Sequence, residues 1–115
     1  MKNILLILSI LGIFVSCTTF DKIKINIPDN YEEIIIKNEH GGNVYGLFLK
    51  IDGKVNGYLE IEFTNGENYS EKHIYKNGKI NFIYEGDYYA DEFIIKISPY
   101  DNATGYINIM YSFKT

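Results

Sequence analysis

The sequence has one cysteine, no arginine and no tryptophan in 115 residues. A single cysteine cannot form an internal disulfide, and it excludes the cysteine-rich zinc sites of small domains. The formal net charge is −4, and basic and acidic residues are interleaved along the chain. Because no basic stripe is visible in the sequence, nucleic-acid binding is not expected.

Motifs for catalysis are also missing. His40 and His73 are far apart in the sequence and show neither H-x-x-H nor H-x-H spacing, so solvated histidines are expected instead of metal ligands. No serine lies in a G-x-S-x-G motif. The sequence therefore predicts a non-enzyme, with a hydrolase whose triad assembles across space as the less favoured alternative.

β-branched and aromatic residues are abundant, and they occur in short alternating runs. Such runs, separated by turn residues at regular spacing, are typical of all-β sandwiches and barrels. Residues 57–64 illustrate the pattern, with Leu59, Ile61 and Phe63 expected to point inward. The runs cover residues 22–27, 33–37, 44–51, 57–64, 69–75, 79–84, 92–98 and 106–113. We expect a small antiparallel β-sandwich of about eight strands.

Turn signals define the predicted strand ends. Asn77-Gly78 lies between two strand-like runs and predicts a type I′ hairpin, because both residues tolerate positive φ angles. Asp52-Gly53 and Asn65-Gly66 are read as further turns, and residues 99–105 as the last loop.

The N-terminus begins with Met1-Lys2-Asn3 and continues with an apolar run over residues 4–15. This run is shorter than the ~20 residues that a membrane-spanning helix needs. A short positive start before an apolar stretch is typical of a cleaved secretory signal.

The end of this run, Phe14-Val15-Ser16-Cys17, resembles the lipobox of bacterial lipoproteins. The resemblance implies that the Cys17 thiol receives a diacylglycerol and that a type II signal peptidase cuts before it. Residues 1–16 would then be the signal peptide, residues 17–22 a lipid-anchored tether and residues 23–115 the β-sandwich domain. In that class, Thr18 after the cysteine favours the outer membrane or the cell surface over the inner membrane.

Exposed tyrosines are the candidate binding residues of the mature chain. Eleven tyrosines are present, and their rigid amphipathic rings suit protein interfaces and stacking on sugars. The candidates in loops or on outward positions are Tyr58, Tyr88, Tyr89, Tyr100 and Tyr106. The leading expectation is a protein partner, either an envelope component or a toxin or enzyme that the chain neutralises. The alternative is a carbohydrate-binding surface module.

Loop carboxylates give a weaker signal for calcium. Asp87 and Asp91 lie in one predicted loop and Asp101 in the next. Calcium prefers oxygen ligands from neighbouring loops, but the chain has no D-x-D-x-D run. No cofactor is expected, and calcium is the one metal that these residues could hold.

Overall fold

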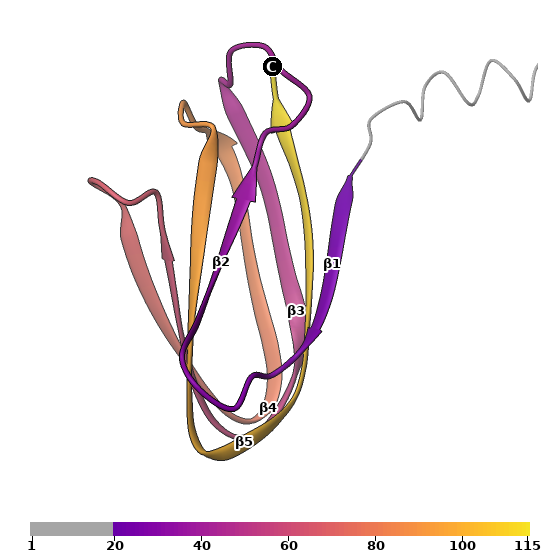
Figure 1. Cartoon of the computed structure of the whole chain (residues 1–115), viewed down its shortest axis with the longest axis vertical. Coiled ribbons are helices and arrows are strands. Elements are labelled where there is room, and N and C mark those ends of the chain that lie inside the picture. The colour runs from indigo at the N-terminus through magenta and orange to yellow at the C-terminus, as the bar shows by residue number, and fades with distance from the viewer. Residues whose placement is uncertain (1–19) are drawn as a thin grey trace, which may run out of the picture.

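The computed structural model describes residues 20–115, which form five strands and their connecting loops. The strands are β1 (Asp21–Asn26), β2 (Glu32–Lys37), β3 (Gly46–Thr64), β4 (Ser70–Asp87) and β5 (Glu92–Lys114). All paired strands are antiparallel, so the all-β prediction is confirmed (Figure 1). The predicted signal peptide, Cys17 and the start of the tether lie outside the described residues.

One continuous open sheet connects all five strands. Its order is β1-β5-β3-β4, and β2 pairs separately with β5. The second part of β5 pairs with β1, for example Ile109 with Ile23, whereas its first part pairs with β2, for example Ile95 with Ile34. The sheet therefore has two halves. The β1 half contains β1 with residues 46–55, 78–87 and 104–114, and the β2 half contains β2 with residues 58–64, 70–76 and 92–100.

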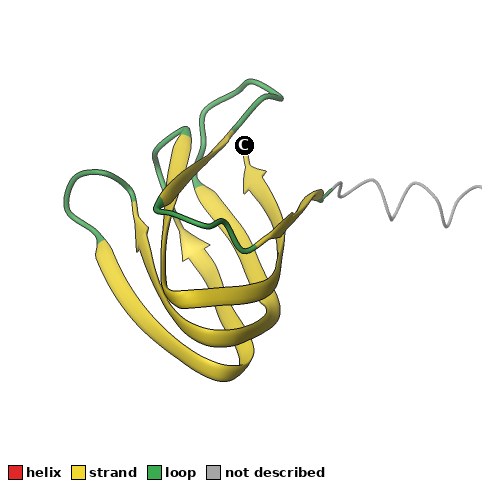
Figure 2. Cartoon of the chain, turned by 60° about the horizontal axis from the view of Figure 1, so that its bottom comes forward, coloured by secondary structure: helices red, strands yellow, loops and turns green. Residues whose placement is uncertain are grey.

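A bend separates the two halves, and β3, β4 and β5 all run through it without a break (Figure 2). In β3 the register shifts between Val55 and Tyr58. In β4 the bend falls at Asn77, whose φ is 42°. In β5 Asp101 and Asn102 have φ values of 55° and 54°. Extra residues and positive φ angles change the direction of a strand without ending it.

The core lies between the two halves of the bent sheet. Alternate residues of each long strand point inward, as the sequence pattern predicts. Tyr84 in the β1 half contacts Phe93 in the β2 half, with ring centroids 6.3 Å apart. The fully buried side chains are Ile36, Leu47, Leu49, Ile51, Leu59, Ile61, Phe63, Ile80, Phe93, Ile95, Ile97 and Ile107.

Two features of the predicted architecture need correction. The structure has five strands instead of about eight, and the two separate sheets of a sandwich are not confirmed. Asp52-Gly53, Asn77-Gly78 and residues 99–105 were predicted to reverse the chain, but all three lie inside long strands. Glycine and asparagine supply positive φ angles to bulges as readily as to turns. At the N-terminal side β1 begins at Asp21, inside the predicted tether.

Candidate functional site

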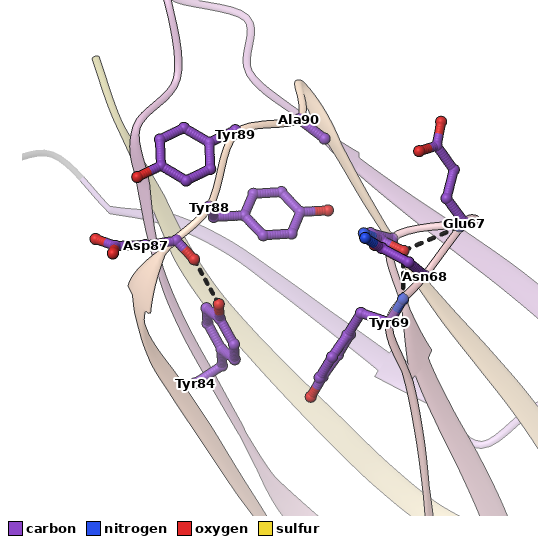
Figure 3. Close-up of a pocket in the computed structure, with 9 residues that line it drawn as sticks. Glu67, Asn68, Tyr69, Tyr84, Asp87, Tyr88, Tyr89 and Ala90 are labelled. Atoms are coloured by element: carbon purple, nitrogen blue, oxygen red, sulfur yellow. Dashed lines mark hydrogen bonds between the residues drawn. The ribbon is translucent and has the colours of Figure 1, made fainter.

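A polar cavity lies at the open end of the bent sheet, and Figure 3 shows its lining residues. It occupies about 460 Å³ between the β3–β4 loop, residues 65–69, and the β4–β5 loop, residues 88–91. A volume of this order is typical of small-molecule sites. We call it the tyrosine pocket, and its lining consists of Asn65, Glu67, Asn68, Tyr69, Tyr84, Asp87, Tyr88, Tyr89 and Ala90.

The β3–β4 loop is held by side-chain hydrogen bonds to its own backbone. Asn65 Oδ1 accepts from the N–H groups of Glu67 and Tyr69 at 2.9 and 3.0 Å. The Thr64 hydroxyl donates to the Tyr69 carbonyl at 2.6 Å and accepts from the Gly66 N–H at 2.9 Å. Asparagine and threonine stabilise turns in this way. The turn predicted at Asn65-Gly66 is therefore present, and it places Tyr69 at the edge of the pocket.

The β4–β5 loop supplies the opposite wall. Tyr88 is buried and its hydroxyl donates to the Glu92 carbonyl. Tyr84 donates to the Asp87 carbonyl at 2.6 Å, a bond drawn in Figure 3. Tyr89 is 75% exposed. This wall thus combines two tyrosines held by backbone hydrogen bonds with one that is free to meet a ligand.

Contacts between aromatic rings hold the tyrosines of the pocket against the core. The rings of Tyr69 and Tyr84 lie 5.9 Å apart in an edge-on arrangement, and Tyr84 meets Tyr88 at 6.2 Å in the same way. Phe93, which is fully buried, contacts Tyr88 with ring centroids 5.6 Å apart. Edge-to-face contacts of this kind stabilise aromatic clusters, so the rings are fixed before any ligand arrives.

Two phenols of the pocket, those of Tyr69 and Tyr88, are held in their neutral form. Burial raises the pKa of Tyr88 to about 12. Burial, together with a hydrogen bond to Glu71 at 2.7 Å, raises the pKa of Tyr69 well above its usual range. Neither group loses its proton near neutral pH. These phenols therefore offer ring surfaces and hydrogen bonds, which suit binding, and they are unsuited to general-base or nucleophilic catalysis.

The structure distributes the predicted tyrosines over three places. Tyr88 and Tyr89 line the tyrosine pocket. Tyr58 and Tyr100 contact each other near the bend, with centroids 5.2 Å apart. Tyr106 lies on the outer face of the β1 half, where Lys24 Nζ is 5.3 Å from its ring centroid.

Sequence reasoning missed two tyrosines of the pocket. The sequence predicts Tyr69 and Tyr84 only as strand residues, because they fall inside alternating runs. Each lies next to a loop, Tyr69 just before β4 and Tyr84 three residues before its end. Their position beside a predicted turn was the signal that could have identified them.

The candidate calcium residues do not converge. Asp87 lines the tyrosine pocket, whereas Asp101 lies at the bend. Asp91 is in the β4–β5 loop, and its carbonyl accepts a hydrogen bond from the Asn38 N–H at 2.8 Å. In residues 20–115 no group of three or more histidine, cysteine, aspartate or glutamate side chains is arranged to hold a metal ion. The structure thus places Asp101 at the bend, away from Asp87 and Asp91, which lie at the two ends of the β4–β5 loop.

Each histidine contacts a carboxylate of its own. His40 Nε2 lies 3.6 Å from Asp21 Oδ2, and His73 Nε2 lies 3.5 Å from Glu71 Oε1. His73 also packs against Phe63, with ring centroids 5.7 Å apart. Of the serines, Ser70 donates to Glu62 Oε2 at 2.6 Å. His40 and Ser70 are therefore in surface pairs, as expected for solvated residues. His73 is different, because its ring packs on core aromatic rings and its Nε2 is buried without a hydrogen-bond partner among the described residues.

No protein-family model matches the chain, and no curated protein matches it either. In the part of the chain that the structure describes, no helix has the length and apolar character to cross a membrane.

Proposed function

We propose that the chain is a lipid-anchored, non-catalytic binding protein of the bacterial cell envelope, and that the tyrosine pocket is its ligand site. The observation that carries this proposal is the convergence of four tyrosines, three from two loops and Tyr84 from β4, around one open cavity of about 460 Å³. The raised pKa of Tyr88 supports binding over catalysis, because the phenol keeps its proton at neutral pH.

The lipid anchor in this proposal is carried by Cys17. The lipobox-like sequence Phe14-Val15-Ser16-Cys17 supports it, and so does the start of the sheet at Asp21, which leaves only a short connection between cysteine and fold. Two or three acyl chains on one residue are enough for stable anchoring. The anchor would hold the chain at the outer membrane or the cell surface.

A carbohydrate is the ligand that the tyrosine pocket fits best. Sugars present flat apolar faces, which stack on tyrosine rings, and hydroxyl groups, which pair with amides and carboxylates. Tyr89 offers an exposed ring, while Asn68 and Glu67 supply polar groups on the opposite side of the cavity. The pocket would take one or two sugar units of an envelope or surface glycan.

A glycan array with bacterial-surface oligosaccharides tests this proposal. The purified chain should bind a defined set of glycans, and Tyr89→Ala should weaken that binding at least tenfold. Tyr100→Ala is the matched control, since Tyr100 is also an exposed tyrosine but lies near the bend. Absence of glycan binding, or equal losses in the two variants, would contradict the carbohydrate assignment.

A protein partner is the second candidate, and a different surface supports it. The outer face of the β2 half carries the exposed side chains of Tyr31, Ile35, Ile74 and Tyr100. Charged residues such as Glu62 and Lys72 lie between and beside them. Exposed aromatic and aliphatic side chains among charged residues occur at protein interfaces. An Ile74→Asp variant that loses a partner crosslinked in native cells, while Tyr89→Ala keeps it, would favour this candidate.

A further inference from the structure

Five lysines gather on the outer face of the β1 half, although they come from three different strands, β1, β3 and β4. Lys22 and Lys24 come from β1, where they alternate with the inward Ile23 and Ile25. The strand register places Lys50 in line with Met110 and with Lys22. We call this surface the lysine face; its lysines are Lys22, Lys24, Lys50, Lys54 and Lys79.

The lysine face is positive in a chain whose net charge is −4. Its carboxylates are Asp52 and, at the open end, Glu85 and Asp87; the register places Lys114 at the same end. Asp52 Oδ1 accepts a hydrogen bond from Asn108 Nδ2 at 2.9 Å. Among the described residues, the ion pairs are Lys37 with Glu92, His40 with Asp21 and His73 with Glu71, so no lysine of this face is paired.

The outer face of the β2 half gives a contrast within the same molecule. There Glu62 lies between Lys72 and Lys96 in neighbouring strands, and Glu33 lies opposite Lys96. Opposite charges in such cross-strand positions compensate one another. On the lysine face, by comparison, Lys54 is directly opposite Lys79, an arrangement that costs stability unless an anion lies nearby.

Two adjoining hollows open on the lysine face. Each occupies about 360 Å³, and they share Lys50 and Asp52. The first is lined also by Lys22 and Lys24, and the second by Lys54 and Lys79. Each hollow is therefore lined by three lysines and one aspartate. Lysine is a common binder of phosphate groups, and such hollows suit phosphate-bearing headgroups.

An aromatic pair lies at the end of this face where the chain enters the sheet. Phe20 is 41% exposed and meets Phe48 edge-on, with ring centroids 5.4 Å apart. Phe48 is on the lysine face, in register with Ser112 and Glu85. Aromatic rings with adjacent lysines are characteristic of surfaces that rest at a membrane–water boundary.

We propose that the lysine face docks on an anionic lipid surface. The orientation of the lysine face toward the membrane rests on the proposed lipid anchor at Cys17, which is three residues before Phe20. Three residues span at most ~10 Å, close to the ~8 Å over which salt screens surface charges. A lipid on Cys17 therefore brings Phe20 and the adjoining lysines within range of headgroup phosphates. Docking would leave the tyrosine pocket, at the open end between the two loops, accessible to its ligand.

Amine footprinting of the full chain on vesicles tests this proposal. The chain is bound to vesicles of phosphatidylcholine alone, or of phosphatidylcholine with phosphatidylglycerol, and its lysines are acetylated briefly. We expect the reactivity of Lys22, Lys24, Lys50, Lys54 and Lys79 to fall at least threefold on the anionic vesicles. Lys72, Lys76 and Lys96, on the β2 half, are the internal controls and should keep their reactivity.

Variants in which lysines are replaced by glutamine give a second readout. This readout remains valid when the N-terminal segment also binds the vesicles, because it compares anionic with neutral vesicles. The ratio of partitioning onto anionic and neutral vesicles should fall about 25-fold in Lys54→Gln/Lys79→Gln, since each lysine near an anionic surface contributes about fivefold. Lys72→Gln/Lys96→Gln is the matched control, and it should leave this ratio within about twofold. Circular dichroism of both double variants should show the same β-sheet signal as the unaltered chain.

Several results would overturn the assignment. They are equal lysine reactivity on the two vesicle types, absence of binding to anionic vesicles, or equal losses in the two variant pairs. Protection by soluble polyphosphate without any difference between vesicles would assign the face to an anionic polymer instead. The lipid anchor is tested separately by the intact mass of the chain, which shows whether Cys17 carries a lipid. Absence of the lipid and absence of docking by the lysine face therefore give different results.

Discussion

Phe63 stacks on Phe82 with ring centroids 3.7 Å apart and an angle of 5° between the planes. The two residues belong to different halves of the sheet, since Phe63 pairs with Glu71 and Phe82 with Ile51 in the strand register. The contact therefore joins the two halves across the core. It explains how a single continuous sheet can bury apolar side chains on one face without a second sheet.

Removing one ring of this pair should destabilise the fold strongly. Phe63 is fully buried, and a phenylalanine truncated to alanine in a core costs about 3–5 kcal/mol. We expect Phe63→Ala to lower the free energy of unfolding by that amount in urea titrations. Ile83→Ala, on the outer face and 58% exposed, is the control and should change it by less than about 1 kcal/mol.

The bend depends on glycines that approach a neighbouring backbone closely. Gly105 has a φ of +133°, and an added Cβ would lie 1.9 Å from the Lys54 carbonyl oxygen. Gly105→Ala should therefore lower the free energy of unfolding by more than about 1 kcal/mol. Gly86→Ala, where a Cβ meets nothing within 4 Å, is the control. Equal unfolding midpoints for the two variants would show that the bend does not require this glycine.

Asn77 combines a positive φ of 42° with a hydrogen bond that crosses the bend. Its Oδ1 accepts from the Gly57 N–H at 2.8 Å. Asn77→Ala loses both the hydrogen bond and the tolerance of positive φ, so we expect a loss of about 2 kcal/mol. Asn77→Gly keeps the backbone conformation and should lose about 1 kcal/mol. Thermal or urea unfolding of the two variants would contradict this order if alanine were the milder change.

Much of the fold is predictable from the sequence because alternation is local. Leu59, Ile61 and Phe63 are buried as their spacing predicts. The connections between strands are harder to predict, because the dipeptide Asn77-Gly78 is compatible both with a hairpin turn and with a bend inside a strand. Which of the two forms depends on whether β3 continues alongside, and that pairing is a long-range property that no local pattern contains.

The clustering of charge on the lysine face cannot be predicted from local sequence either. Along the chain its lysines are interleaved with acidic and apolar residues, so no basic stripe is visible. Side chains of a strand alternate between two faces, and the register then aligns Lys22 with Lys50 and Lys54 with Lys79. The tyrosine pocket is similar, because it depends on two loops meeting in space. Tyr88 and Tyr89 could be selected as loop residues, whereas Tyr69 and Tyr84 fall inside alternating runs and are marked only by their position beside predicted turns.

Alkaline pH should weaken the fold through the tyrosines. The pKa of Tyr88 rises from 10.0 to about 12 on folding because the phenol is buried. The folded state then holds its proton more tightly, so this contribution to stability is complete below pH 10 and is lost as the pH approaches 12. Urea unfolding between pH 8 and pH 11 should show the decline. Tyr88→Phe should be less stable at neutral pH and show a smaller decline, and an unchanged slope would contradict the assignment.

The proposed lipid on Cys17 would hold this sheet at an envelope membrane, and the proposed roles of both surfaces depend on that location. The most direct measurement is the intact mass of the chain recovered from the membrane fraction of its native cells. We predict a chain that begins at Cys17, with the added mass of a diacylglycerol, and a Cys17→Ser variant that lacks this mass and leaves the fraction. A native chain that retains Met1, or one that is cleaved without lipid and is not membrane-bound, would contradict the account.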